Sequence, residues 1–149
     1  MKLQLQSLCI SLFSILILSM KSDMNRKEML CHKWIQFAFK NNGSDSPKAI
    51  DNSMAKECDF HSDGSYEESS YNNTLKISGH WFTNPDQSKI GFTYEQMNGQ
   101  KLPVFPDTTK RYNMVIIKLT KDTLIYGQEA YYGKDKVYGH SDWYFVRKD

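Results

Sequence analysis

The sequence predicts an all-β protein folded as an eight-stranded antiparallel up-and-down β-barrel. Short runs rich in β-branched and aromatic residues recur along the chain, turn signals with Gly, Pro, Asn or Asp separate them, and no segment shows a long helical period. Aromatic residues make up 13% of the chain, which suits pleated strands better than helices. Successive hairpins favour a meander, and closing it into a barrel removes edge strands that would invite aggregation.

The predicted strands follow one another through short or moderate links. A polar stretch at 21–29 precedes the first strand and has room for one helical turn, and the later polar link has room for a short helix near Ser46–Ala55. The Asp63-Gly64 pair marks a tight hairpin because it tolerates positive φ. The eight strands are Leu30–Lys40, Glu57–His61, Ser65–Ser70, Leu75–Thr83, Ser88–Gln96, Arg111–Leu119, Thr123–Gln128 and Val137–Arg147.

Residues 1–22 have the pattern of a signal peptide. Lys2 supplies the positive charge, and the apolar run 8–20 is too short to span a bilayer comfortably but suits the hydrophobic part of a signal. The alternative is an uncleaved membrane anchor. Lipidation is disfavoured because Cys9 lies near the start of the apolar run. We therefore expect an exported protein, periplasmic or extracellular, with a single domain at 23–149 and no stable membrane span after cleavage.

The charge distribution argues against binding to nucleic acid or to an anionic membrane surface. The chain has 19 basic and 17 acidic residues, a net charge of +2, and no long run of like charge. Both kinds of partner require a concentrated basic patch. We therefore expect no nucleic-acid partner.

Two cysteines remain once the leader is removed, Cys31 and Cys58. In an oxidising compartment a disulfide between them would stabilise the fold by roughly 3–4 kcal/mol in the chain-entropy model. The alternative is two separate buried thiols that behave as small apolar residues. Two cysteines without matching His or Cys pairs do not predict a zinc site.

Each of the three tryptophans follows a histidine closely, which raises the question of a histidine centre. Alternate strand residues face opposite sides, so placing Trp81 inward turns His80 outward. The same rule places Trp143 inward and His140 outward. Only His32, which has the same parity as Trp34, could point inward. The odd positions of this strand, Ile35, Phe37 and Phe39, are also apolar, so a bend or bulge could switch its faces. The sequence therefore predicts no metal site.

Two acidic or nucleophilic clusters also lack the geometry for catalysis. Neighbouring strand residues point to opposite faces, so His140-Ser141-Asp142 cannot form a triad and Glu67-Glu68 cannot act as an acid/base pair. The sequence contains no Gly-rich phosphate loop and no metalloprotease helix. We expect a protein without catalytic activity or cofactor.

Several short motifs, taken in order, resemble those of the small secreted bacterial proteins called lipocalin-like domain proteins. They are Trp34 in the first strand, the segment Phe60–Tyr66, the triplet Gly79-His80-Trp81 and the segment Leu119–Leu124. The resemblance covers about residues 30–147. It implies a calyx, a barrel closed at one end that can hold a small apolar ligand.

The resemblance also implies a pair of residues at the barrel floor. Lipocalins carry Gly-x-Trp in the first strand and a late Arg packed over that Trp, and Trp34 and Arg147 fall in suitable places. Such a cation–π contact contributes about 0.5–2 kcal/mol. His32 stands where the family has Gly, which is a departure from the pattern, as is the absence of a lipidated Cys.

The same parity rule selects the residues that face the barrel interior. They either line a calyx or fill a solid core. Likewise, the loop 97–110 either forms a lid or packs as a crossover. We expect a small apolar or amphipathic ligand in the calyx; the alternative is a filled barrel whose loops contact an envelope protein or glycan. The predicted inward residues are Phe60, Tyr66, Ile77, Trp81, Ile90, Phe92, Tyr94, Met114, Ile116, Leu124, Tyr126, Trp143 and Phe145.

Overall fold

The computed structural model describes residues 26–41, 43–103, 114–132 and 137–148. The predicted signal peptide at 1–22 lies outside these ranges, so it stays a prediction. The same holds for the part of the loop 97–110 from residue 104 onward and for the first three residues of the predicted strand Arg111–Leu119.

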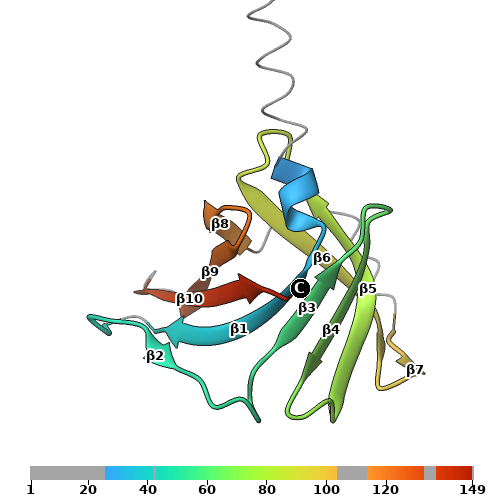
Figure 1. Cartoon of the computed structure of the whole chain (residues 1–149), viewed down its shortest axis with the longest axis horizontal. Helices are drawn as coiled ribbons and strands as arrows, with labels where there is room; N and C mark the ends of the chain where they lie inside the picture. Colours follow the sequence, from blue (N-terminus) through green and yellow to red (C-terminus); the bar gives the residue numbers. More distant parts are fainter. Residues whose placement is uncertain (1–25, 42, 104–113, 133–136, 149) are drawn as a thin grey trace, which may run out of the picture.

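Eight strands form a closed antiparallel barrel, as predicted (Figure 1). Each pairs with the next in the ring β1-β3-β4-β5-β6-β8-β9-β10, and β10 returns to β1 with Arg147 opposite Trp34. Two further strands of two residues each, β2 and β7, pair with β1 and β6. The bounds are β1 Lys33–Lys40, β2 Lys48–Ala49, β3 Glu57–Phe60, β4 Ser65–Ser70, β5 Leu75–Thr83, β6 Lys89–Met97, β7 Gln100–Lys101, β8 Met114–Leu119, β9 Thr123–Tyr132 and β10 Val137–Arg147.

The first strand starts three residues later than predicted, because residues 26–30 form a helical turn. Leu30, the last residue of this turn, is fully buried and belongs to the hydrophobic core. The Trp34 indole N–H donates to the Leu30 carbonyl at 3.0 Å. The turn therefore covers one end of the barrel and is anchored to it.

The short helix for which the sequence has room near Ser46–Ala55 does not form. This segment contains β2 and a turn in which Met54 N–H donates to the Asp51 carbonyl at 2.9 Å. The Asp51 carboxylate accepts from Ser53 N–H at 2.8 Å. An Asp side chain that bonds the backbone two residues on favours a turn over a helix, which explains the difference.

The predicted Asp63-Gly64 hairpin is confirmed. Gly64 has φ of 89°, and the Asp63 carboxylate accepts from Ser65 N–H at 2.8 Å. The Gly64 carbonyl accepts from the backbone N–H of Trp81 at 2.8 Å, which ties the turn to β5.

A β-bulge in β1 explains why both faces of this strand are apolar. Its register with β10 shifts between Gln36 and Ala38, so that Phe39 lies opposite Trp143. Directly opposite residues share a face, and the bulge therefore turns Phe39 to the inward side. Phe37 sits at the bulge and is 45% exposed.

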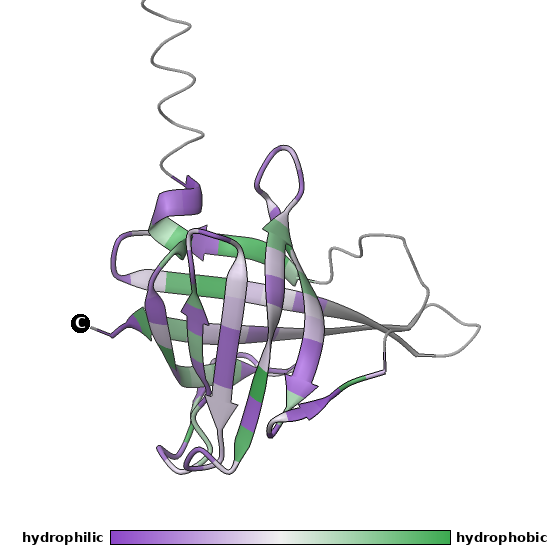
Figure 2. Cartoon of the chain, turned by 90° about the vertical axis from the view of Figure 1, so that its right-hand side faces the viewer, coloured by the Kyte–Doolittle hydropathy of each residue, from purple (hydrophilic) through white to green (hydrophobic). Residues whose placement is uncertain are grey.

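Polar and apolar residues alternate along the strands, as expected where one face is buried (Figure 2). The registers of neighbouring strands agree on which residues share the inward face: Tyr66 lies opposite Phe60 on one side and Gly79 on the other. The registers thus define which residues face the interior around the ring of strands.

Candidate ligand-binding site

One end of the barrel interior, which we name the packed end, is occupied by buried apolar and aromatic side chains. Its rings meet edge to face: the Phe60 centroid lies 5.1 Å from Tyr66 and 5.5 Å from Trp81. The Trp81 indole N–H, which would otherwise be unsatisfied, donates to the His61 carbonyl at 2.9 Å. The buried residues of the packed end are Leu30, Trp34, Phe60, Tyr66, Trp81, Ile90, Leu124 and Phe145.

The other end of the interior, the open end, carries aromatic and apolar residues that face inward yet are only partly covered. Tyr94 lies opposite Gly79, on the face of Tyr66, but is 42% exposed. Its ring stacks on Phe92 with centroids 5.9 Å apart and planes 9° from parallel. The open end comprises Phe39, Ile77, Phe92, Tyr94, Met114 and Trp143, of which all but Tyr94 are half-buried.

The thirteen predicted inward residues thus divide between the two ends and the level between them. Ile116 and Tyr126 lie at the intermediate level; they are opposite each other in the register and both are buried. The role of these residues in ligand binding stays a prediction. Parity missed Phe39, because only the bulge in β1 turns it inward.

A polar cluster lies inside the barrel between the two ends. Glu68 is opposite Cys58 on one side and Ile77 on the other, so it faces inward, and it is only 8% exposed. Its Oε2 accepts from the Tyr66 hydroxyl at 2.7 Å, and its Oε1 pairs with Lys56 Nζ at 3.1 Å. Sequence reasoning treated Glu68 only as a neighbour of Glu67; its shared parity with Tyr66 would have placed it inward.

The Cys58 thiol completes this cluster. It lies 3.2 Å from the Tyr66 hydroxyl and within hydrogen-bonding reach of Tyr126. Burial, and then the nearby Glu68 carboxylate, raise the pKa of Cys58 to about 12. Burial likewise raises the pKa of the Tyr66 and Tyr126 hydroxyls far above their usual value. These groups are therefore neutral hydrogen-bonding partners at physiological pH.

The possible disulfide between Cys31 and Cys58 is not formed in this structure. Cys31 and Cys58 are both free thiols, Cys58 buried and Cys31 half-buried against the same core cluster. This arrangement matches the alternative of two small apolar core residues.

The predicted floor pair is aligned by the backbone. Trp34 is fully buried and Arg147 lies opposite it in the β1–β10 register. Burial, followed by the positive charge of Arg147, lowers the pKa of His32, whose ring meets Trp34 edge to face at 6.3 Å. The cation–π contact of Arg147 itself stays a prediction. A cation that does lie over a ring is Lys27, with Nζ 5.7 Å from the Trp81 centroid.

The predicted split between His80 and Trp81 is confirmed. Trp81 is 4% exposed, whereas His80 is exposed on the outer face with Nε2 3.4 Å from the Glu95 carboxylate. His61 is also exposed. The side chain of His140 lies outside the described part of the chain. Within that part, no three His, Cys, Asp or Glu residues are grouped so as to hold a metal ion.

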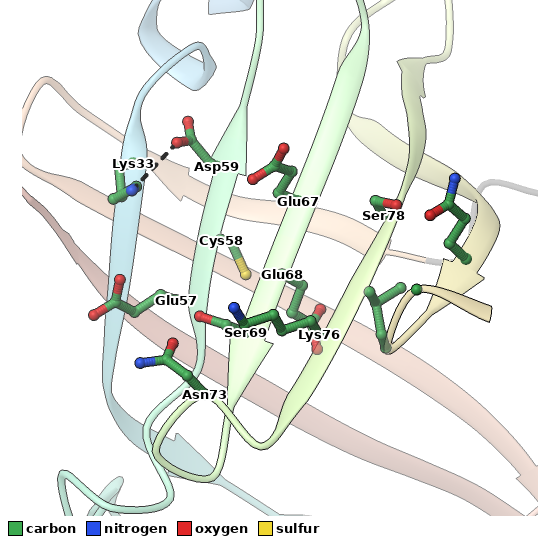
Figure 3. A pocket seen from close by; sticks show the side chains of 13 residues that line it. Lys33, Glu57, Cys58, Asp59, Glu67, Glu68, Ser69, Asn73, Lys76 and Ser78 are labelled. Carbon is green, nitrogen blue, oxygen red and sulfur yellow. Dashed lines mark ion pairs between the residues drawn. The ribbon is translucent and has the colours of Figure 1, made fainter.

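The outer face of the barrel carries a polar groove of about 360 Å³ (Figure 3). Its side chains come from β1, β3, β4, β5 and β6 and include Glu57, Asp59 and Glu67. Lys33 on β1 forms an ion pair with Asp59 on the neighbouring strand β3, with Nζ 3.5 Å from Oδ2. The groove lies mainly on the outer face of the sheet, but Cys58, Glu68 and the predicted calyx residue Ile77 also line it. The alternation of inward and outward residues in the sequence gave no sign of this groove.

The strands form a closed eight-stranded up-and-down barrel, the fold that the resemblance implied. In the described residues, no helix is long and apolar enough to cross a membrane. No family model matches the chain, and it matches no curated protein.

Two solved structures are similar to the chain at low sequence identity. One is apocrustacyanin C2, at 16% identity and a TM-score of 0.48. The alignment covers 86% of this chain and 66% of the apocrustacyanin chain, so this chain spans just under two thirds of its length. The other is a DUF4847 family protein from Bacteroides vulgatus, at 11% identity and a TM-score of 0.47. That alignment covers 81% of this chain and 96% of the Bacteroides protein.

Proposed function

We propose that this protein is an exported, non-catalytic lipocalin-like barrel that binds a small apolar or amphipathic ligand at its open end. The observation that supports this most strongly is the exposure of Tyr94. Tyr94 belongs to the inward face, yet the residue is 42% exposed, so the protein's own side chains cover it only in part. Half-buried Phe92 and Trp143 lie at the same end.

The physical gain from binding is burial of this aromatic surface. Removing apolar surface from water contributes roughly 25 cal/mol per Å², and aromatic rings also offer stacking geometries. Hydroxyl groups of Tyr94 and Tyr126 set the orientation of the ligand. Binding pockets of this kind combine an apolar lining with a few polar groups.

A second candidate function uses the outer groove instead of the interior. Its lining is carboxylates, lysines and amides, including Glu67, Lys76 and Gln96, which suits a polar partner such as a glycan or a protein segment of the cell envelope. In this case the interior would contribute only to stability. The two functions therefore assign binding mainly to opposite faces of the same strands, although Glu68 and Ile77 border both sites.

Native mass spectrometry of the protein purified from its host separates them. We expect a co-purifying small molecule, lost in Tyr94→Ser and Trp143→Ala but retained in the matched outer-face variant Phe37→Ser. A thermal-shift panel of lipids and pigments checks the same three variants. A protein that carries no small molecule and responds to none of the panel, but is stabilised by a glycan in a manner abolished by Glu67→Gln, would instead establish the groove as the functional site.

A further inference from the structure

Glu68 is a charged side chain held inside the barrel at the border of the packed and open ends. Its carboxylate makes two contacts, one from each oxygen, to Lys56 and to the Tyr66 hydroxyl. A carboxylate oxygen can accept two hydrogen bonds, so these contacts leave acceptor capacity on both oxygens. A buried carboxylate is costly unless it is paired with a positive charge.

Lys56, the partner of this carboxylate, is the more accessible member of the pair. Its side chain is 28% exposed, against 7% for Glu68. A lysine ammonium on a flexible stem can swing into water at little cost, whereas Glu68 cannot leave the interior. A second cation that reaches Glu68 from the open end can therefore share the carboxylate or replace Lys56.

The groups around Glu68 also favour a cation. The stacked Phe92 and Tyr94 rings present π-faces, which attract positive charge. The centroid of the Tyr94 ring lies 6.5 Å from that of Tyr66, whose hydroxyl donates to Glu68. Burial, and after it the Glu68 carboxylate, raise the pKa of Tyr94. Tyr66 and Cys58 on the other side are neutral. An anionic head group would face Glu68 with repulsion, and a neutral donor could hydrogen-bond to it only without the attraction of an opposite charge.

We propose that the ligand of the open end carries a protonated amine on an apolar body, and that Glu68 is the residue that selects the amine. This inference rests on the proposed function and narrows its ligand class. The apolar body lies against Phe92, Tyr94 and Trp143, and the ammonium lies at Glu68, beside or in place of Lys56.

Three probes with the same body and different heads test the inference: naphthalene-methylamine, naphthalene-methanol and naphthalene-carboxylate, titrated calorimetrically into the protein at neutral pH. We expect the amine to bind at least about tenfold more tightly than the alcohol, because a charge-assisted hydrogen bond exceeds a neutral one by that order, and the carboxylate to bind most weakly. Glu68→Gln keeps the shape and the Tyr66 hydrogen bond, and it should remove the amine preference while leaving alcohol binding unchanged. Glu67→Gln, its exposed neighbour on the other face, is the matched control and should change nothing.

Lys56→Gln gives the complementary result. Removing the competing cation should tighten amine binding several-fold. Tightest binding by the carboxylate probe, weakened by Lys56→Gln, would mean that Lys56 anchors an anion and would overturn the inference. Equal binding of the three heads would also overturn it while leaving the proposed function standing. Absence of binding by all three probes and by their decyl-chain analogues would overturn the proposed function itself.

Discussion

Trp81 and Trp143 both belong to the inward face of the barrel, yet their surroundings differ. Trp81 is 4% exposed, meets Phe60 edge to face, and has its indole N–H satisfied by the His61 carbonyl. Trp143 is half-buried and contacts Tyr126 with centroids 5.8 Å apart. The protein's own residues cover nearly all of Trp81, whereas part of Trp143 remains accessible.

The difference indicates how one barrel divides its interior between stability and binding. The packed end combines the helical turn at 26–30 with nearly all of the largest fully buried side chains, so it carries most of the burial that stabilises the fold. The open end leaves apolar surface uncovered, which adds little to stability; in the proposed function this is the surface that the ligand covers. Substitutions at the two ends should therefore have unequal effects on the free energy of unfolding.

The largest effect is expected for Phe60→Ala at the packed end. Phe60 is 1% exposed and its ring contacts Tyr66 and Trp81, so truncation leaves a cavity and should lower the free energy of unfolding by about 3–5 kcal/mol. Tyr94→Ala at the open end and Phe37→Ala on the outer face should each lower it by less than about 1 kcal/mol. Urea denaturation measures all three, and equal losses would contradict the division of the interior.

A smaller but still large effect is expected for Gly79→Ala, at the bulge between β5 and β6. An added Cβ would overlap the Thr93 carbonyl oxygen and lie 2.9 Å from both the Thr93 carbonyl carbon and Tyr94 Cα. These are backbone atoms, so β6 would have to move, at a cost of roughly 1–3 kcal/mol. Because β6 carries Phe92 and Tyr94, ligand binding should fall as well. Ser78→Ala, one residue away on the outer face, is the control and should leave unfolding and binding unchanged.

Local patterns were sufficient to predict the ring of strands. Strand alternation and the turn at Asp63-Gly64 act over a few residues, and they place Trp81 inward and His80 outward as observed. The helical turn at 26–30 was anticipated only as a possibility, because its burial of Leu30 depends on strands distant in sequence. The bulge that turns Phe39 inward also depends on pairing with β10, at the far end of the chain.

The polar cluster was not predictable in the same way. A parity rule guided by apolar residues ignores an inward carboxylate, so Glu68 was passed over although it shares a face with Tyr66. Its pairing with Lys56 and its proximity to Cys58 require β3 and β4 to be placed side by side. The outer groove likewise arises from the three-dimensional shape of the sheet, which no strand specifies alone.

The reactivities of the cysteines sharpen the comparison within the packed core. Burial raises the pKa of Cys58 to about 12 and also raises that of Cys31, which is only half-buried. A raised pKa leaves the thiol protonated at pH 8, and the thiolate is the form that reacts. Native Cys58 should therefore be alkylated by iodoacetamide at least about tenfold more slowly than Cys31. Two effects add here: Cys58 is less accessible to the reagent, and a smaller fraction of it is present as thiolate.

Peptide mass spectrometry after timed alkylation gives both rates. In denaturant without reductant, both cysteines should react fully, because both are free thiols in the structure. A failure of both to react until reductant is added would restore the disulfide between Cys31 and Cys58.

The smallest effect is expected for Lys27→Ala, at the outer side of the packed end. Lys27 Nζ lies 5.7 Å from the Trp81 ring centroid, and its side chain is exposed, so the cation–π contact should contribute about 0.5 kcal/mol. Arg26→Ala, in the same helical turn but without this contact among those described, is the matched control, and Lys27→Arg should retain most of the stability. Thermal unfolding followed by tryptophan fluorescence detects the difference. A loss of several kcal/mol in Lys27→Ala would mean that the helical turn depends on this contact for docking, and that the packed end is held closed from outside as well as by its buried rings.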